Sequence, residues 1–520
     1  MNRLGIVLSS KFVETDVSEV YGVLPPSFLP VRNQRLYAKQ IEILSQKCNR
    51  IVMTLPIDYR IPNSDLKLIE TLGIEIIRVD KNFTIEEVII FCLEVIGDTS
   101  LPFEILYGDT ILQGDMPLDS VAVAIKPDRH LWGKNESILE LEHMQGSGAE
   151  FVMAGRFCFS DQKSFLEAAA KSTGEILTTM MLYEDFHPLK YFVGDGWLDF
   201  GHLSTLQQSK LAATESRYFN SIEISDSVVT KRSSNLQKLK EEIAWYRSVP
   251  REAEIFVPKM HSWGADYYEL DYIASPTLHE LLVLGNLDRQ NWLKIFQGLA
   301  KYFKVAISIT SGSYDGPQQL ATLSELLEQK TFQRAAEFLS QNSTFSETFN
   351  VDIDTIISHQ NISYLINQID MRNTESLGFF HGDLCATNIF WDSREDTCKF
   401  IDPRGQNFES INTPLGDLRY DIAKIYQSFV LGYDLVLEDK FEYVPISGNL
   451  KLRFLDEPQS EFYRGLITDE LCKPLGIDVA EIHMMGILLI IGLLPLHSDR
   501  PDRQNAFLQI IRQEIERLQK

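Results

Sequence analysis

The sequence predicts an N-terminal α/β domain with a mostly parallel sheet, followed by an α+β domain with two lobes. Up to about residue 160, short apolar runs alternate with helical patterns, as they do in α/β layers. A small lobe, 216–275, is indicated by three strand candidates and one amphipathic helix, and helical periodicity dominates the large lobe, 276–520. The predicted domains are therefore 1–215 and 216–520.

The length and composition are those of a soluble globular enzyme. At about 150 residues per domain, a chain of 520 residues allows two to four domains. Asp and Glu number 73 against 49 Lys and Arg, so the formal net charge is −24. This charge repels phosphate backbones and anionic lipid surfaces, so nucleic acid is not expected as a partner.

The sequence indicates a cytoplasmic protein without a membrane span. Its six cysteines form no CxxC pair and no zinc-type cluster with histidine, which indicates buried thiols in a reducing compartment. The apolar run Leu4–Leu8 is followed closely by Lys11, which indicates a strand rather than a signal peptide. The longest apolar run, Met484–Leu496, is too short to cross a bilayer as a helix.

The first domain carries four landmarks in order. They are PPSFLPVRNQRLYAKQIEIL, ILYGDTIL with Asp109, FVMAGRFCFS, and GDGWLDFGHLSTL with Asp199. Together they resemble the sugar-nucleotide nucleotidyltransferases, which join an NTP to a sugar phosphate and release pyrophosphate. The resemblance implies that Asp109 and Asp199 bind a metal ion on a nucleotide, with CTP or UTP as candidates.

This domain also departs from the family pattern. Where the family has a glycine-rich loop that ends in Arg, the chain has SSKFVETDVSEVYG, with glycine only at Gly22. The family's phosphate-binding Lys aligns with Pro26, and Lys11 or Arg32 are the candidates to replace it. Active nucleotidyl transfer and a catalytically silent, substrate-presenting or oligomerising domain both stay open. An unrelated α/β domain is disfavoured by the four landmarks.

In the small lobe, the strand candidates SIEIS, SVVTKRS and YYELDYI precede and follow the helical segment NLQKLKEEIAWYRSV. Lys231 ends the second strand. At 100° per residue, Glu242 falls at the edge of the helix's apolar face, whereas Glu241 points away. We therefore expect Glu242 to be the partner of Lys231, although each charge alone is typical of a solvated surface.

The most informative motif is HGDLCATN, residues 381–388, which is followed by the strands IFWD and KFIDP. An aspartate at the start of such a loop, Asp383, can accept the proton of an attacking hydroxyl. Asn388, five positions later, and Asp402, one hairpin away, can converge on the magnesium ion of a nucleotide. The alternative, that Asp383 caps a turn and Asn388 fills a loop, explains this ordered set less well.

This constellation resembles the aminoglycoside phosphotransferase and choline kinase superfamily, in which HGD replaces the HRD of protein kinases. The resemblance covers roughly residues 218–515 and implies a bilobal, protein-kinase-like fold that uses ATP and Mg²⁺. It implies the following roles: Asp383 is the catalytic base, Lys231 binds the nucleotide phosphates and is held by Glu242, Asn388 and Asp402 bind the metal, and His381 and Asp421 support the loop. Arg404 is expected to pair with a phosphate, a substrate anion or a neighbouring side chain.

These observations predict a kinase for a small hydroxyl compound, with a sugar or amino sugar favoured, beside a nucleotidyltransferase-like domain. This pairing suggests the synthesis of activated precursors for capsular or surface polysaccharide, by family analogy. One alternative is an aminoglycoside, choline or ethanolamine kinase with a non-catalytic N-terminal domain. Another is a binding or scaffold protein in which both domains are degenerate. A homo-oligomer is left open.

Overall fold

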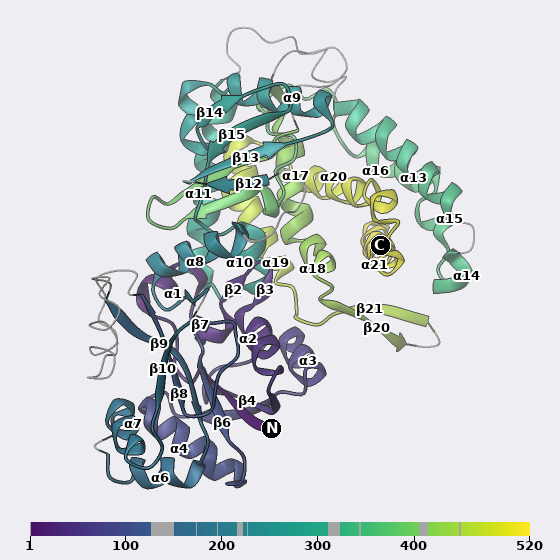
Figure 1. The fold of residues 1–520 in the computed structure, drawn as a ribbon. Coiled ribbons are helices and arrows are strands. Elements are labelled where there is room, and N and C mark those ends of the chain that lie inside the picture. The colour runs from purple at the N-terminus through teal and green to yellow at the C-terminus, as the bar shows by residue number, and fades with distance from the viewer. Residues whose placement is uncertain are drawn as a thin grey trace. The chain divides into compact units, whose positions relative to one another are not determined.

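A computed structural model describes residues 2–125, 150–172, 174–194, 196–215, 222–225, 227–309, 323–342, 345–404, 414–446 and 449–519. The chain divides into two compact units, coloured by residue number in Figure 1. Unit 1 comprises Met1–Ser216 and Leu284–Leu287, and unit 2 comprises Arg217–Val283 and Asp288–Lys520. The predicted boundary after residue 215 adjoins residues 216–221, which lie outside the described part.

The centre of unit 1 is a sheet that has, among the described residues, seven strands in the order β10-β8-β9-β6-β1-β4-β5. Every pairing is parallel except those of β9, which runs antiparallel to both β6 and β8. The mostly parallel sheet predicted for this domain is therefore confirmed. The strands are β1 (Arg3–Leu8), β4 (Cys48–Pro56), β5 (Glu75–Val79), β6 (Phe103–Tyr107), β8 (Ser120–Ile125), β9 (Phe151–Phe159) and β10 (Lys190–Val193).

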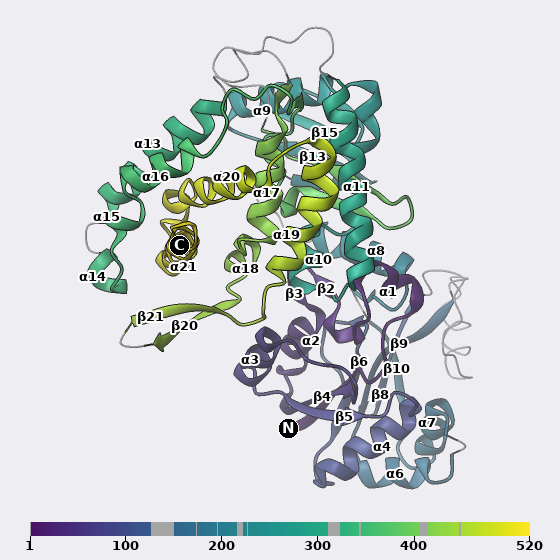
Figure 2. The ribbon, with the colours of Figure 1, turned by 180° about the vertical axis from the view of Figure 1, so that it is seen from behind.

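Helices α4 (Ile85–Ile96), α6 (Gln162–Ala169) and α7 (Ile176–Glu184) bury one apolar side against this sheet, and Figure 2 shows them together. A capping box between Thr84 and Glu87 begins α4. The other elements of unit 1 are α1 (Thr15–Tyr21), η1 (Pro26–Phe28), α2 (Leu36–Leu44), α3 (Asn63–Thr71), α8 (Leu203–Glu215), and the short strand pairs β2 (Pro30–Val31) with β3 (Gln34–Arg35) and β7 (Thr110–Ile111) with β11 (Leu198–Asp199).

The small lobe of unit 2 is an antiparallel sheet in the order β12-β13-β15-β14, with helix α9 (Leu236–Arg247) after its second strand. The strands are β12 (Ile222–Ser225), β13 (Val228–Arg232), β14 (Met260–Trp263) and β15 (Tyr267–Asp271), and a 3₁₀ helix, η2 (Arg251–Phe256), follows α9. The sequence predicts only three of these strands. It misses β14 because this strand has only four residues, all exposed or half-buried, and no apolar run.

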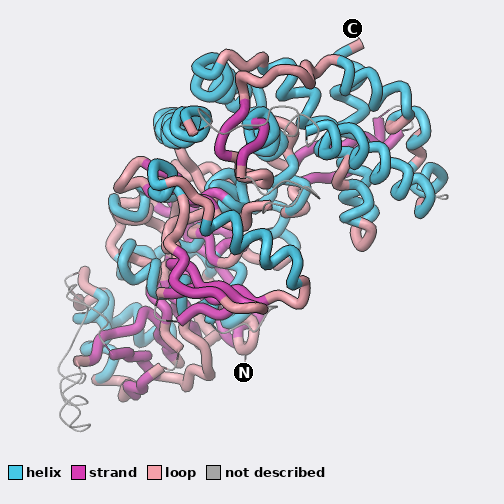
Figure 3. Tube along the Cα trace, turned by 90° about the horizontal axis from the view of Figure 1, so that it is seen from above, coloured by secondary structure: helices cyan, strands magenta, loops and turns pink. Residues whose placement is uncertain are grey.

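The large lobe is mainly helical, as the cyan tube in Figure 3 shows for the C-terminal part. Its α-helices are α10 (Leu278–Leu284), α11 (Arg289–Ser308), α13 (Lys330–Gln341), α14 (Phe345–Phe349), α15 (Ile353–Ile356), α16 (His359–Asn367), α17 (Leu418–Phe429), α18 (Tyr433–Leu437), α19 (Ser460–Leu466), α20 (Val479–Ile491) and α21 (Pro501–Leu518). Shorter helical turns are η3 (Glu325–Gln329), η4 (Ala386–Asn388), η5 (Ile467–Cys472), η6 (Lys473–Leu475) and η7 (Leu494–His497). Three antiparallel two-stranded pairs join β16 (Leu377–Phe379) to β19 (Leu415–Asp417), β17 (Ile389–Asp392) to β18 (Thr397–Phe400), and β20 (Phe441–Ile446) to β21 (Asn449–Phe454).

Helix α20 is the buried centre of this lobe, since every residue from Ile482 to Ile491 is buried. It packs against α17, whose residues are also largely buried. Within the described ranges, no single helix has the length and apolar character to cross a membrane. One pair bent by 116°, Ser460–Leu475 with Val479–Ile491, meets that test by length and composition only.

Candidate functional site

In the small lobe of unit 2, Lys231 on β13 meets Glu242 on α9. Lys231 Nζ lies 2.8 Å from Glu242 Oε2 and 2.9 Å from Asp402 Oδ1. The hydroxyl of Tyr268 also donates to Glu242 Oε2, at 2.9 Å. Burial alone would lower the pKa of Lys231, but Asp402 and Glu242 raise it above its ordinary value. The lysine is therefore a fixed cation between two carboxylates.

Helix α9 is placed by its cap and by one buried side chain. The side chain of Asn235 accepts from the backbone N–H of Lys238, which begins the helix. Trp245 is buried and donates from Nε1 to the carbonyl oxygen of Phe380, at 2.8 Å. The helix that carries Glu242 is thus hydrogen-bonded to the start of the loop that carries Asp383.

The loop after β16 is held by Asp421 of α17. Its carboxylate accepts the backbone N–H groups of His381 and Gly382, both at 2.8 Å. Burial raises the pKa of Asp421 to about 7, although the two N–H groups act to lower it. Gly382 has φ +82°, and a Cβ there would lie 2.8 Å from Cβ of Arg404, so only glycine fits this approach.

His381 supports this loop in its neutral form. Its Nε2 lies 3.1 Å from the carbonyl oxygen of Ile401, and its Nδ1 accepts from the N–H of Asp383 at 3.3 Å. These bonds assign the ring proton to Nε2. Burial lowers the pKa of His381 to about 4, so the ring stays neutral near pH 7. It acts by hydrogen bonding, as the resemblance implies.

The side chain of Asp383 forms an ion pair with Lys424 of α17, with Nζ 3.0 Å from Oδ1. Burial would raise the pKa of this carboxyl, but Lys424 and Arg404 hold it below its ordinary value. The Asp383 side chain is still 44% exposed, so a substrate hydroxyl can reach it. Asp383 is therefore an accessible carboxylate that stays ionised near neutral pH.

Asn388 and Asp402 lie at the same end of one hairpin. Strand β17 pairs with β18 so that Ile389 faces Phe400, and the N–H of Ile401 donates to the carbonyl oxygen of Asn388 at 3.0 Å. Asn388 Nδ2 donates to the Asp383 carbonyl oxygen at 2.9 Å, and its Oδ1 accepts from the Thr387 hydroxyl at 3.4 Å. An amide and a carboxylate oxygen are suitable Mg²⁺ ligands, so these residues fit the metal that the resemblance implies.

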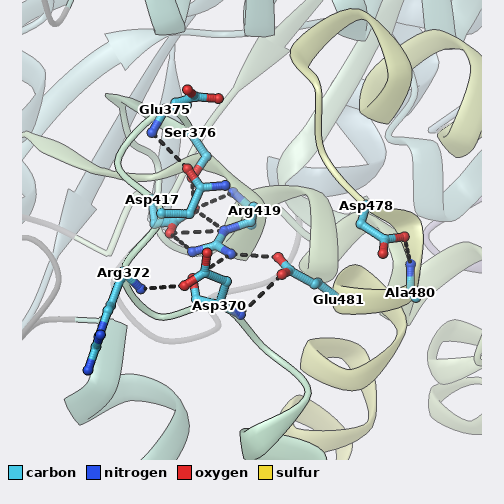
Figure 4. A network of polar contacts seen from close by, with 10 residues as sticks. Asp370, Arg372, Glu375, Ser376, Asp417, Arg419, Asp478, Ala480 and Glu481 are labelled. Carbon is cyan, nitrogen blue, oxygen red and sulfur yellow. Dashed lines mark hydrogen bonds and ion pairs between the residues drawn. The ribbon is translucent and has the colours of Figure 1, made fainter.

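Helix α17 carries most of these supports, and Figure 4 shows how it begins. The Arg419 side chain is fully buried and bonds Asp417 through Nη2 at 2.6 Å and Glu481 through Nη1 at 2.6 Å. Nη1 also donates to the carbonyl oxygen of Asp370 at 3.0 Å. Asp417 is the N-cap of α17 and accepts the Arg419 N–H. The start of the helix is thereby fixed to α20 and to the segment before β16.

Sequence reasoning missed the cation beside Asp383. Lys424 follows Asp421 by three positions on α17, and residues three apart share one face of a helix. That spacing could have indicated a lysine directed at the same loop. Two further cations near Asp383, Lys330 and Arg334 on α13, lie about 50 residues upstream in the sequence, where no local pattern links them to the motif.

In unit 1, the structure brings Asp109 and Asp199 together. Strands β7 and β11 pair Thr110 with Asp199, and the N–H of Phe200 donates to the Asp109 carbonyl oxygen at 2.8 Å. A Cβ on Gly201 would lie 2.9 Å from Asp109 Oδ2 and 3.4 Å from Asp199 Oδ1. Both carboxylates therefore border the same small space. Burial raises the pKa of Asp109 above its ordinary value, as expected for a desolvated carboxyl.

The segment in place of the expected glycine-rich loop runs from the end of β1 into helix α1, which ends at Tyr21 and is capped by Gly22. Its first two residues, Ser9 and Ser10, are buried. Lys11 is exposed, Arg32 is half-buried, and Pro26 begins the 3₁₀ helix η1. In the described residues, no group of three or more His, Cys, Asp or Glu side chains could hold a metal ion. Among the described residues, the candidate metal site of unit 1 therefore has at most two carboxylates, those of Asp109 and Asp199.

No protein-family model and no curated protein matches the chain. Solved structures similar to 42% of this chain include a protein from Bacillus anthracis described as a glucose-1-phosphate thymidylyltransferase, in complex with a sucrose (16% identity, TM-score 0.31, 98% of that chain). They also include the inositol-1-phosphate CTP transferase from T. maritima (15%, 0.31, 98% of that chain) and a UDP-glucose pyrophosphorylase complexed with UDP-glucose (14%, 0.30, 100% of that chain).

Proposed function

We propose that unit 2 is an ATP- and Mg²⁺-dependent phosphotransferase that phosphorylates a hydroxyl group of a small molecule of the sugar class. The observation that carries the proposal is the position of Lys231, which bonds both Glu242 and Asp402 at 2.8 and 2.9 Å. A lysine held by a buried glutamate and joined to a metal-type aspartate is the arrangement that positions nucleotide phosphates in kinases.

The remaining residues supply what phosphoryl transfer requires. The side chains of Asn388 and Asp402 would hold Mg²⁺, which when bound neutralises charge on the nucleotide phosphates. Asp383 orients the acceptor hydroxyl and accepts its proton. Its pKa is below the ordinary value, which suits a loose transition state in which positioning contributes more than strong basicity. Asp421 and His381 keep the loop in place.

For unit 1, we propose nucleotidyl transfer with a second NTP, CTP or UTP, onto a phosphate-bearing compound. The support is the approach of Asp109 and Asp199 to one small space beside Gly201. Two carboxylates so placed could hold a metal ion on the nucleotide. The missing glycine-rich loop keeps a catalytically silent domain as the alternative.

Together, the two units suggest the synthesis of an activated precursor for capsular or surface polysaccharide. ATP and a second NTP are cytoplasmic compounds, and a cytoplasmic protein with small-molecule substrates is our working proposal. A homo-oligomer is also compatible with it. The aminoglycoside, choline or ethanolamine kinase requires a cationic acceptor, and the charges beside Asp383, described below, do not favour one.

The test is ADP release by the purified full-length protein with MgATP and a panel of acceptors. The panel includes hexoses, amino sugars, sugar acids, sugar phosphates, choline, ethanolamine and aminoglycosides. Turnover that depends on both an acceptor and Mg²⁺ is the expected result. Turnover that persists in Asp383→Asn would overturn the assignment of the base.

A further inference from the structure

A small cavity lies beside Asp383 within unit 2. Its volume is about 40 Å³. A water molecule needs roughly 10–15 Å³ of this kind of space, so the cavity admits a group of only a few heavy atoms. A carboxylate or phosphate group matches that size, whereas a whole sugar does not. The cavity therefore selects one group of a ligand.

Four cations line this cavity, and they come from three separate segments. Lys330 and Arg334 lie on α13, Arg404 follows β18, and Lys424 lies on α17. The lining also includes three apolar side chains, Leu488, Leu489 and Leu493, from α20 and the turn after it. Apolar neighbours reduce the screening of nearby charges relative to a fully exposed surface.

Few carboxylates balance the four cations. Lys424 pairs with Asp383. Arg334 donates from Nη1 to the carbonyl oxygen of Gly492 at 2.5 Å, and Arg404 donates to the Tyr420 hydroxyl at 3.2 Å. Neither of these partners is charged. Among the described residues, no carboxylate lies within ion-pair distance of Lys330.

The nearby acidic groups do not change this balance. Glu337 attracts Arg334 but lies on the exposed side of α13. Asp421 is already bonded to two backbone N–H groups, and its pKa is raised to about 7. Burial and the cations Arg404, Arg334 and Lys424 lower the pKa of Lys330 to about 8. Lys330 and Arg334 are therefore destabilised by neighbouring cations, and a bound anion would stabilise both charges.

We propose that this cavity binds an anionic group, a carboxylate or a phosphate, of the acceptor, so that the kinase acts on an anionic hydroxyl compound such as a sugar acid or a sugar phosphate. This inference rests on the proposed kinase function and names its substrate class. Arginine side chains bind both groups through paired hydrogen bonds, and lysine binds them as a point charge. Neutral sugars lack the group that the cavity selects, and ammonium compounds would be repelled.

The cavity lies next to the proposed catalytic base. Lys424 lines the cavity and also touches Asp383, so the anionic group and the reacting hydroxyl are separated by one ammonium group. In the transfer, the acceptor oxygen forms a bond to the γ-phosphorus while the bond from that phosphorus to the β,γ-bridging oxygen breaks. ADP leaves, and the hydroxyl proton passes to Asp383.

The first experiment compares matched acceptors at equal concentration with the unmodified protein. Glucose is compared with glucuronate and glucose 6-phosphate, and glycerol with glycerate and glycerol 3-phosphate, by ADP release. We expect kcat/KM at least 100-fold higher for an anionic member than for its neutral partner. A higher kcat/KM for the carboxylate compound or for the phosphate compound shows which of these two groups the cavity binds. A neutral or cationic acceptor that performs best would overturn the inference and leave the kinase proposal standing.

The second experiment removes the cations that are remote from the base. Lys330→Met and Arg334→Met should each raise the KM for the acceptor about 10- to 100-fold, because each removes a charge-assisted contact. The KM for ATP should change by less than twofold. The control Lys304→Met, on the exposed side of α11, should change neither constant. A rise in the KM for ATP alone would assign the cavity to the nucleotide and contradict the inference.

A binding measurement separates the inference from the kinase proposal. The Tm of the unmodified protein should rise with glucuronate or glucose 6-phosphate and not with glucose, whereas Arg334→Met should lose this rise. Such a rise without ADP release would retain the anion site and reject the kinase. If no anionic compound shifts the Tm or supports turnover, the inference is wrong.

Discussion

The Lys231–Glu242 pair offers the sharpest test of the nucleotide site, through Glu242→Gln. The substitution keeps the size of the side chain and removes its charge. Glu242 is 2% exposed, and it receives Lys231 Nζ and the Tyr268 hydroxyl at 2.8 and 2.9 Å. The carbonyl oxygen of glutamine can still accept from both Lys231 and Tyr268, so the change removes the negative charge beside Lys231. It also removes the ion pair with Lys238, whose Nζ lies 3.7 Å from Glu242 Oε1 and whose side chain is exposed, so that this pair contributes little.

The expected loss in kcat/KM depends on the contacts that Lys231 keeps in the Glu242→Gln variant. Removing one partner of a buried pair typically costs about 3–5 kcal/mol, because the other charge is left alone. Here Asp402 still lies 2.9 Å from Lys231 Nζ, so the charge is not left unpaired. The loss then approaches that of one hydrogen bond to a charged group, about 1.5–3 kcal/mol, or roughly 10- to 150-fold in kcat/KM.

The assay is ADP release at varied MgATP and saturating acceptor, with urea unfolding as a measure of stability. The matched control is Glu241→Gln, one residue away on the same helix and not joined to Lys231. We expect kcat/KM for ATP to fall in Glu242→Gln and to stay within twofold in Glu241→Gln. Equal effects of the two variants, or no effect of the first, would refute the reasoning that Glu242 positions the lysine.

Three further predictions concern the base, unit 1 and the cationic cavity. Asp383→Asn should reduce ADP release at least about 1,000-fold, because the acceptor loses its proton-accepting contact. Its Tm should also fall, because Lys424 loses its carboxylate partner, so ADP release is measured well below that Tm. Asp469→Asn, on the surface, is the control, and a similar loss there would count against the assignment. Gly201→Ala should reduce NTP-dependent pyrophosphate release while ADP release persists, because the new methyl group would lie 2.9 Å from Asp109 Oδ2 and must displace this carboxylate. Pyrophosphate release that is unchanged in this variant would count against a metal ion held by Asp109. Lys330→Met should raise the free energy of unfolding at pH 7 relative to the unmodified protein. The folded-state pKa of Lys330, about 8, is below its unfolded value of about 10.4. The charged lysine therefore destabilises the fold fully below pH 8, and the stability gained by Lys330→Met should decrease as the pH rises from 8 towards about 10.4. Urea unfolding at pH 7 and 10 measures this change, and a gain that is independent of pH would contradict the prediction.

Much of the fold was accessible from local patterns. The alternating apolar runs of the first domain form a mostly parallel sheet, because strands buried on both faces leave a strong signal in sequence. Strand β14 and the pair β20–β21 left no such signal, since their side chains are half-exposed or exposed where described. Their pairing depends on neighbours that sequence patterns do not reveal.

The sequence likewise predicted some residues of the candidate site and missed others. Asp383, Asn388 and Asp402 lie within about 20 residues of one another, so their order along the chain could indicate a shared site. Glu242 could be chosen over Glu241 from helical periodicity, and the structure brings Glu242 to Lys231. Lys330 and Arg334 join Arg404 and Lys424 at the cavity through tertiary packing of α13, which no short segment encodes.

Helix α17 also determines which of its side chains face the loop that carries Asp383. From its N-cap, Asp417, it presents Asp421 to the loop, Lys424 to the base and Ser428 to the N–H of Ala386. Inserting one residue would turn everything beyond it by about 100°, so this helix tolerates no change of length. Helix α13 does not hold the loop in this way. Divergence in acceptor preference among related chains is therefore expected at Lys330 and Arg334, with α17 kept constant.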